Sequence, residues 1–195
     1  MTLKSATSLP LLIVALFASL SHAQTFPSEI RGYKVHRLNV HLRTGDPEKD
    51  QSGPALTIGS PDVVSFALTG VTIEAAAEIA GLDQEGEVDF LTFKDIVANG
   101  IPLDLEEYQH PFKLKKGEKA VLPAPVRGTV SAANMAKAAY QESTAPREDW
   151  QVTGTVFVFG HFKKMGITFK RVIPVPVTLT VPNPIKAITA AAKPH

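Results

Sequence analysis

Four carboxylates alternate along one short stretch, and they come closest to a chemical site in this sequence. Asp83, Glu85, Glu87 and Asp89 occupy every second position of DQEGEVD. Gathered at the rim of a turn, they could bind calcium, which takes about six to eight oxygen ligands, or a suitably spaced pair could hydrolyse a glycoside. The stretch lacks the ligand spacing of an EF-hand loop, which favours a solvated acidic turn that guards a sheet edge.

The histidines do not form a metal-ligand pattern. Those after residue 23 are His36, His41, His110, His161 and His195. His36 and His41 are five residues apart, which puts their side chains on opposite faces of a strand. We therefore expect isolated surface histidines and no metal site.

No signature of a nucleophile or of a phosphate-binding loop occurs. The chain has no cysteine and no Gly-x-Ser-x-Gly elbow, although sequence order alone does not exclude a Ser-His-Asp triad. Gly81 and Gly86 flank the acidic stretch without a lysine and helix placed to hold a phosphate. We expect a protein that is not an enzyme, with no catalytic, cofactor-binding or metal-binding residues and no cofactor; a hydrolase is the last-ranked alternative.

The N-terminal residues predict export. They place one lysine before an apolar run from Leu9 to Leu20, and Ser21 to Ala23 supplies the small residues of a cleavage site. The alternative, a membrane anchor, needs about 20 apolar residues, which is more than this run contains. We therefore expect a signal peptide over 1–23, no membrane anchor, and a periplasmic or extracellular product.

Length and charge limit the remaining possibilities. Removing 23 of 195 residues leaves 172, which is enough for one domain with its own core. We expect this domain over 24–184 and a flexible C-terminal tail over 185–195. Because Lys4 is the only charge in the signal, the rest balances 19 basic against 19 acidic residues, and it has no basic run. This predicts no nucleic-acid partner and no surface for anionic lipids.

Alternation of apolar and polar residues predicts short strands along most of the chain. Leu38, Val40 and Leu42 alternate with polar residues, and a short strand over 56–58 follows a long loop. From 71 to 79 the odd positions are apolar, which favours a strand, although the alanines and glutamates there also suit a helix.

Two hairpins are expected in the second half of the chain. Asn99-Gly100 lies between apolar runs and tolerates the positive φ angles of a tight turn. A second hairpin turns through 161–166, after a strand with one apolar face. That face consists of Trp150, Val152, Val156 and Val158. The nearby phenylalanines lack the polar group that is usual at recognition surfaces, so we expect core packing for Phe157, Phe159, Phe162 and Phe169.

One segment, over 132–142, predicts a helix. Ser131 can cap it, and its alanines, methionine and lysine favour the helical state. The expected apolar stripe consists of Ala132, Met135, Ala136, Ala139 and Tyr140. Because the helix is short and rich in alanine, we expect it to cover one end or one edge of the sheets.

A Pro-x-Pro phrase occurs twice, in KAVLPAPVRGTV and in KRVIPVPVTLTV, 51 residues apart. Proline has no N–H, and two prolines at i and i+2 remove donors from the same side of a strand. We therefore expect each phrase at a sheet edge or where a strand crosses from one sheet to another. The alternative is an exposed proline-rich ligand for another domain.

The order of these elements predicts an all-β, two-sheet antiparallel sandwich with one short helix. Within it, Thr92 to Val130 contains a strand, Asn99-Gly100, a short strand, Lys116-Gly117 and AVLPAPVRGTV. This order resembles the late embryogenesis abundant type 2 group and the water-stress and hypersensitive-response (WHy) domain. The resemblance extends over residues 66 to 181, although AGLDQEGE replaces the family's Asn-Pro-Asn. It implies a sandwich of fibronectin type III or immunoglobulin kind without cofactor or catalytic residues.

These observations together predict an exported, non-enzymatic protein that protects against desiccation and osmotic stress, with client proteins as its partners. The alternative is an extracytoplasmic accessory module that binds a glycan or a partner protein through loops at one end of the sandwich.

Overall fold

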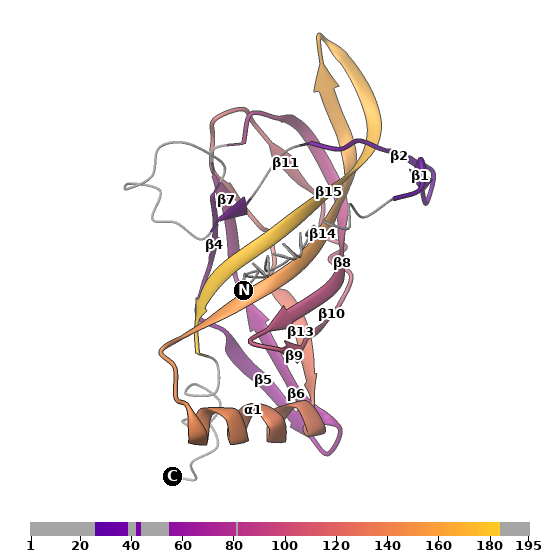
Figure 1. Cartoon of the computed structure of the whole chain (residues 1–195). Coiled ribbons are helices and arrows are strands. Elements are labelled where there is room, and N and C mark those ends of the chain that lie inside the picture. The colour runs from indigo at the N-terminus through magenta and orange to yellow at the C-terminus, as the bar shows by residue number, and fades with distance from the viewer. Residues whose placement is uncertain (1–25, 39–41, 44–54, 81, 184–195) are drawn as a thin grey trace, which may run out of the picture.

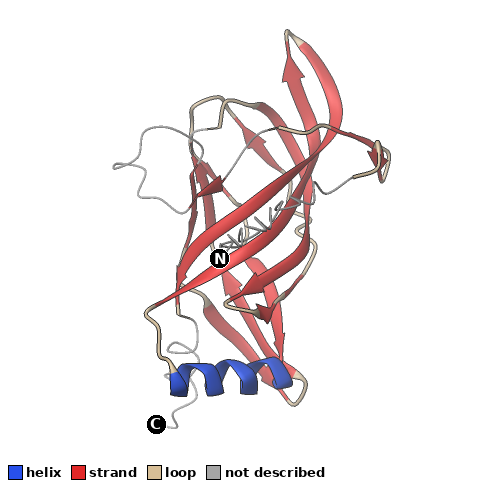
Figure 2. Ribbon diagram, in the orientation of Figure 1, coloured by secondary structure: helices blue, strands red, loops and turns tan. Residues whose placement is uncertain are grey.

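The computed structural model describes residues 26–38, 42–43, 55–80 and 82–183, and within these ranges it consists mainly of strands with one helix (Figures 1 and 2). The larger sheet contains β1 (Glu29–Ile30), β2 (Tyr33–Val35), β3 (Leu42–Arg43), β4 (Ala55–Ile58), β7 (Ala77–Ala80), β8 (Glu85–Ala98), β9 (Ile101–Pro102), β11 (Phe112–Leu114), β12 (Ala120–Val121), β14 (Asp149–Lys164) and β15 (Ile167–Pro182). The smaller sheet contains β5 (Asp62–Ala67), β6 (Gly70–Ala75), β10 (Asp104–Leu105) and β13 (Val126–Ser131). The expected mainly β architecture is confirmed. The expected signal peptide and C-terminal tail lie outside the described residues.

The larger sheet is curved around a central interior. Its main path runs β11-β8-β14-β15-β3-β4-β7-β12, and its two end strands, β11 and β12, contact each other because only the turn at 115–119 separates them. Not all neighbours are antiparallel as expected, because β15 pairs in parallel with β2 and with β3, and β3 pairs in parallel with β4.

Strands cross from the larger sheet to the smaller one at adjacent places. β4 leads into β5, β12 into β13 and β9 into β10, and β6 leads back into β7 at Ala76. Pro123 and Pro125, the first Pro-x-Pro phrase, lie between β12 and β13 at such a crossing. Proline suits this position because a residue between two ladders has no strand partner for its N–H.

The second Pro-x-Pro phrase, Pro174 and Pro176, lies inside β15. Beyond its pairing with β14, this strand pairs with β2 at Arg171 and Val172 and with β3 at Val177 and Thr178. The carbonyl of Val172 faces β2, accepting from the N–H of His36 at 2.9 Å, so the backbones of Pro174 and Pro176 face the same side. The two missing donors therefore fall between β2 and β3. The first phrase occupies the expected crossing position. The second does not lie at a sheet edge, because β15 has paired neighbours on both sides, and its prolines fall between the β2 and β3 pairings instead.

The predicted helix is α1 (Ala132–Thr144), and the N–H of Asn134 donates to the capping Ser131 Oγ at 3.3 Å. It lies across one end of the sheets, opposite the tip of the β14–β15 hairpin (Figure 2). The predicted apolar stripe was wrong, because Ala138 is the buried residue while Ala136, Ala139 and Tyr140 are exposed. The sequence contains alanines all around this helix, so alanine positions alone could not fix which face packs. No helix among the described residues is long and apolar enough to cross a membrane.

Among the described residues, three hairpins turn through a two-residue Xaa-Gly pair with positive φ at both positions, as a type I′ turn requires. They are Arg31-Gly32 between β1 and β2, Asn99-Gly100 between β8 and β9, and Met165-Gly166 between β14 and β15. The Asn99-Gly100 turn was predicted. The last hairpin is longer than expected, because β14 continues to Lys164 and the turn is confined to Met165-Gly166.

Other strand predictions hold in part. The short strand over 56–58 corresponds to β4, and the 71–79 stretch forms β6 and β7 rather than a helix. Of the strand expected through Leu38, Val40 and Leu42, Leu38 lies in no strand and Leu42 begins β3, whereas Val40 lies outside the described residues.

Candidate ligand-binding cavity

Apolar side chains from both sheets face one shared interior and leave a cavity of about 230 Å³ between them. Among the described lining residues, Gln84 is the one whose side chain carries an amide, and none carries a charge. Protein interiors are packed like organic crystals, and voids larger than a water molecule are few. A hydrocarbon-lined cavity of this size is therefore the most distinctive feature of this core.

Strand periodicity produces the cavity wall. On β15, every odd position from Ile173 to Val181 lines the cavity. On β14, the predicted apolar face lines it as well; these residues are Trp150, Val152, Val156 and Val158. A register shift between Thr153 and Thr155 on β14 accompanies its pairing with β8. The wall is thus built mainly from valine, leucine and isoleucine at alternate positions of long paired strands.

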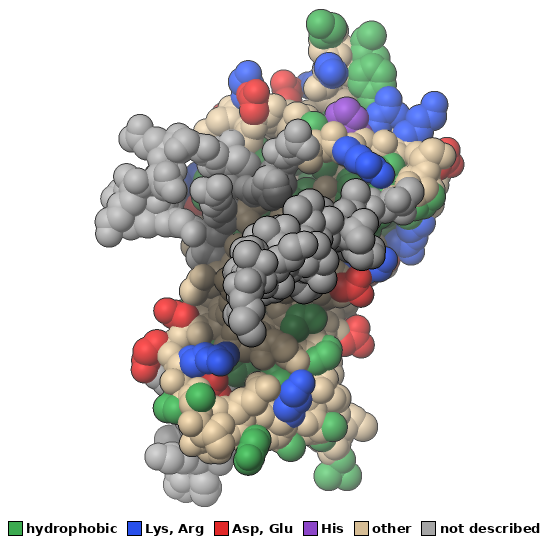
Figure 3. Space-filling model, viewed as in Figure 1, with side chains coloured by type: hydrophobic (Ala, Val, Ile, Leu, Met, Phe, Trp, Pro, Cys, Tyr) green, Lys and Arg blue, Asp and Glu red, His purple; other side chains and the backbone are tan. Residues whose placement is uncertain are grey.

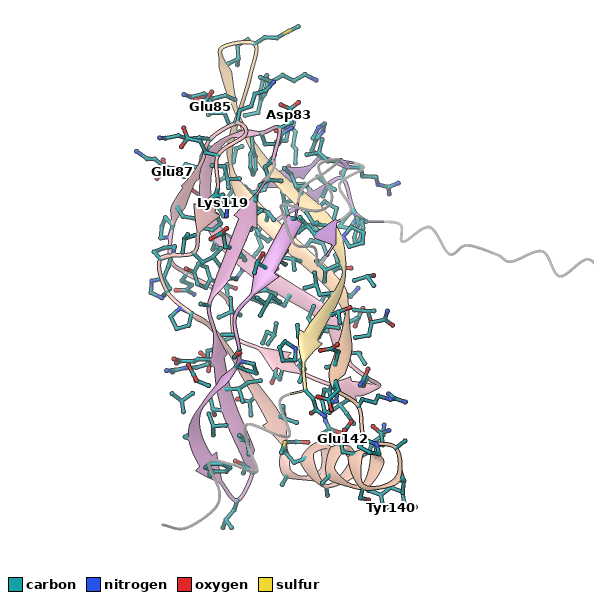
Figure 4. The ribbon with its side chains drawn as sticks, turned by 90° about the vertical axis from the view of Figure 1, so that its left-hand side faces the viewer. Asp83, Glu85, Glu87, Lys119, Tyr140 and Glu142 are labelled. Carbon is teal, nitrogen blue, oxygen red and sulfur yellow. The ribbon has the colours of Figure 1, made fainter. Side chains whose placement is uncertain are left out.

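A carboxylate fixes the helix that closes one end. Met135 and Ala138 of α1 line the cavity. Glu142, near the end of α1, accepts hydrogen bonds from Trp150 Nε1 at 2.9 Å, Asn183 Nδ2 at 2.7 Å and the N–H of Arg147 at 3.0 Å. The Arg147 N–H is the largest cause that lowers the pKa of Glu142; the Trp150 and Asn183 bonds add to this, and burial opposes it. One ionised side chain thereby joins the helix to the start of β14 and the end of β15 (Figure 4).

Many lining residues are partly exposed, and two groups of these lie outside β14 and β15. Ile58, Pro61 and Ile73 lie beside the crossing from β4 to β5. Leu82 and Gln84 lie just before β8, at the end away from α1. There the carbonyl of Leu82 accepts from the N–H of Gly117 at 3.0 Å, and Lys116 Nζ is 2.7 Å from Asp83. Gln84 is therefore placed where a polar group could leave the apolar interior.

The four carboxylates do not form the acidic rim that their spacing allowed. The expected turn was wrong for three of them, because β8 begins at Glu85 and therefore includes Glu87 and Asp89. Asp83 pairs with Lys116 and Glu85 with Lys163, at 2.7 and 2.6 Å, and the labelled side chains point outward (Figure 4). Within the described residues no group of His, Cys, Asp and Glu is placed to hold a metal ion.

Asp89 belongs instead to a small polar cluster on the outer face of β8 and β14. Tyr33 Oη donates to Asp89 Oδ2 at 2.8 Å, and His161 Nδ1 lies 3.1 Å from the same oxygen. Burial, followed by the Asp89 bond and charge, raises the pKa of Tyr33 to about 12. The cluster overlies a second core of aromatic rings, in which Phe90 and Phe159 are stacked 4.4 Å apart. It fastens β2 to the sheet.

The other histidines and phenylalanines of the sequence prediction lie at different places in the structure. His36 and His110 are exposed, and His41 and His195 lie outside the described residues. Phe162 packs in the main core and Phe157 and Phe159 in the second one, as expected for core residues. Phe169 is only half-buried. Its ring centroid lies 5.2 Å from Cζ of the Arg171 guanidinium.

Sequence reasoning identified the apolar faces but not the cavity between them. The faces of β14 and of 71–79 were visible as alternation, which reports which side chains point inward. The space left between inward side chains depends on how far apart the sheets stand, and no local pattern records that distance.

The comparisons with known proteins add a single structural likeness. No family model and no curated protein matches the sequence. A crystal structure of a protein from Archaeoglobus fulgidus aligns with a TM-score of 0.33 and 11% sequence identity, covering 66% of this chain and 96% of that chain. Function is therefore inferred from the cavity.

Proposed function

We propose that this protein binds an apolar small molecule, such as the acyl chain of a lipid, between its two sheets. The observation that carries the proposal is the cavity of about 230 Å³, lined almost wholly by hydrocarbon. An apolar cavity of about 150 Å³ is already enough to hold benzene. The proposed ligand lies along the valine and leucine walls, with its polar end near Gln84.

The energetics favour a hydrocarbon occupant. At about 24 cal/mol per Å³, a cavity of about 230 Å³ left unfilled would cost roughly 5 kcal/mol. That is a large fraction of the typical net stability of a domain, about 5–15 kcal/mol. Each methylene that enters regains about 0.8 kcal/mol of transfer free energy. A chain of several methylenes thus both fills the space and binds with useful affinity.

The same lining disfavours a glycan inside the sandwich. Sugar hydroxyls lose their hydrogen bonds to water on entry, and an unpaired buried hydroxyl costs about 1–3 kcal/mol. Gln84 alone could not satisfy them. A glycan or protein partner on the outer loops remains the alternative proposal, separate from the cavity.

The test uses Trp150, the single tryptophan in the chain, whose side chain lies in the cavity wall. Titration with 8-bromooctanoic acid, whose chain matches the cavity volume, should quench its fluorescence in a saturable manner, because bromine quenches only at close contact. Octanoic acid without bromine should compete for the site and reverse the quenching. A titration that shows no saturable quenching would refute the proposal.

Matched variants place the ligand inside the sandwich. Val156→Phe adds volume at a half-buried lining position of β14 and should weaken binding at least about tenfold. Thr153→Phe puts the same ring on an exposed position of the same strand and should bind as the wild type does. If both variants bind equally weakly, or if both bind as the wild type does, the quenching ligand lies outside the cavity.

The stress-protection role expected from the sequence stays a proposal, and so do immunoglobulin-like topology, membership of the WHy group, export and the absence of enzymatic activity. The support for the stress-protection role is the strand pattern around Asn99-Gly100 and the repeated Pro-x-Pro phrase. A deletion strain compared with its parent after drying, osmotic shock and freezing tests it directly, together with survival of a client enzyme in vitro. Indifference in all of these assays would remove the role.

A further inference from the structure

The tip of the β14–β15 hairpin projects beyond the rest of the sheet. β8 pairs with β14 only as far as Lys163, and β2 meets β15 only from Arg171 onward. Between these points the hairpin is two strands wide, and Lys164 pairs with Ile167 across the turn. The tip (residues 164–168) therefore stands clear of the other described strands (Figure 1).

Apolar side chains occupy this tip. Met165 is 94% exposed and Ile167 is 60% exposed, and both lie at the far end of the hairpin. Met165 also has a φ of +52°, a conformation in which glycine, asparagine and aspartate are strongly preferred. The turn thus carries a large apolar residue at a position where a small polar one would be more stable, which indicates a use for the exposed hydrocarbon.

Cations surround the apolar tip on both faces of the hairpin. Lys163 and Lys170 lie on one face, and Lys164 and Arg171 lie on the other, according to the cross-strand register. Among the described residues, Lys163 has an ion-pair partner, Glu85, whereas Lys164, Lys170 and Arg171 are in no salt bridge. Hydrophobic groups at the tip with Lys and Arg below them are visible in Figure 3.

We propose that the β14–β15 hairpin is a docking element for a bilayer surface that contains anionic phospholipid. Met165 and Ile167 enter the boundary between headgroups and acyl chains, where their exposed surface leaves water. The four cations stay at the headgroup level, because lysine and arginine keep their charge in the polar layer while their stems contact hydrocarbon. Each is attracted to anionic headgroups.

The type I′ turn makes the tip suitable for insertion. Because the turn has two residues, both backbones remain paired up to Lys164 and Ile167, so little polar backbone enters the membrane unpaired. Leu82 and Gln84, the partly exposed cavity residues, precede the strand that pairs with this hairpin at Lys163. The inference goes beyond the proposed ligand binding and does not depend on it.

The experiment uses the absence of native cysteine. Met165→Cys, labelled with the environment-sensitive dye NBD, is mixed with vesicles of phosphatidylglycerol and phosphatidylcholine. A blue shift and a rise in emission are expected, with little change on pure phosphatidylcholine vesicles. Leu68→Cys is the matched control, because Leu68 is equally exposed at the β5–β6 turn, near α1. Its dye should remain in water.

Unlabelled variants separate insertion from charge attraction in vesicle sedimentation. Met165→Asp with Ile167→Asp should weaken binding at least about tenfold, whereas Leu68→Asp should not change it. Lys164→Gln should weaken binding about fivefold and reduce its salt dependence. Because these side chains are exposed, the variants should remain folded, and urea unfolding measured in parallel checks this. No sedimentation of the wild type, or equal responses at residues 68 and 165, would overturn the proposal whatever the fatty-acid titration gives.

Discussion

The Asn99-Gly100 and Met165-Gly166 turns share a backbone conformation but differ in what the first residue does. Asn99 and Met165 have φ angles of 47° and 52°, and the following glycines have 78° and 77°. Asn99 is half-buried; its Oδ1 accepts from the N–H of Gln151 at 3.0 Å, and its own N–H donates to the carbonyl of Gln151 at 2.9 Å. Met165 is almost fully exposed. One turn is therefore part of the closed structure beside α1, and the other presents a side chain to the surroundings.

The difference shows how two ends of one sheet can be specialised. At the helix end, Asn99, Ser131 and Glu142 each use a side chain to satisfy backbone or indole donors. At the hairpin end, the described polar contacts of the tip strands are exposed ion pairs such as Lys163 with Glu85. Exposed ion pairs contribute little to stability. We therefore expect substitutions to cost folding free energy at the first end and binding at the second.

The largest stability loss is expected for Glu142→Ala. It removes the acceptor of Arg147, Trp150 and Asn183 at once, and hydrogen bonds to a charged group contribute about 1.5–3 kcal/mol. We expect a loss of about 3 kcal/mol in urea unfolding, with a red shift of Trp150 emission. Glu85→Ala is the control at the other end and should change stability by less than about 0.5 kcal/mol. Similar losses for both variants would contradict the contrast between the two ends.

This carboxylate also gives the stability its acid dependence. The pKa of Glu142 is lowered in the folded protein, so its contribution is fully present above the ordinary value of 4.5 and is lost as pH falls through the lower folded value. Wild-type stability should therefore decline toward that of Glu142→Ala below pH 4.5. Parallel pH profiles of the two proteins would show that Glu142 contributes no linked stability.

A smaller loss, about 2 kcal/mol, is expected for Asn99→Ala. Alanine is less stable with positive φ, and the change leaves the N–H of Gln151 without its acceptor. Asn99→Gly separates the two causes, because glycine accepts the φ angle but still lacks the side-chain oxygen. Urea unfolding should place the glycine variant between alanine and wild type; a glycine variant less stable than the alanine one would refute this account.

At the base of the projecting hairpin, Tyr33→Phe should cost about 1 kcal/mol through loss of the bond to Asp89. Because burial and Asp89 raise the pKa of Tyr33 to about 12, its contribution is complete below the ordinary value of 10 and is lost as pH rises through about 12. The difference between wild type and variant in urea unfolding should hence shrink over this range. Burial also raises the pKa of Tyr108, but Tyr108 is present in both proteins, so its contribution cancels in the difference. A constant difference would exclude the linkage.

Sequence patterns predicted the inner faces, the Asn99-Gly100 turn and the crossing position of the first proline pair because each depends on local rules. Alternation of apolar and polar residues indicates which side chains face inward, and a proline indicates a backbone position without an N–H donor. Neither signal depends on where the strand lies in the sheet. The Arg31-Gly32 and Met165-Gly166 turns were not recognised as such, because arginine and methionine are not residues that type I′ turns prefer.

The two proposed sites depend on distances that no local pattern contains. The cations of the hairpin are separated in sequence by the tip, so no basic run marks them, and only antiparallel pairing brings Lys163 and Lys164 beside Lys170 and Arg171. The docking proposal thus departs from the expectation of no lipid surface. Likewise, the cavity depends on the separation of two sheets whose strands come from distant segments.

The smallest stability effect, and the sharpest test of the comparison, is expected for Met165→Asn. Asparagine suits the first position of a type I′ turn better than methionine, so the variant should gain a few tenths to about 1 kcal/mol in urea unfolding. The same change removes the most exposed apolar side chain of the tip, so sedimentation with phosphatidylglycerol vesicles should weaken about tenfold. Opposite signs for folding and binding are the signature of a residue retained for its surface. If the variant is more stable and binds vesicles unchanged, methionine at this turn has no role in docking; if it is less stable, Met165 makes contacts that support the fold, and the contrast with Asn99 fails.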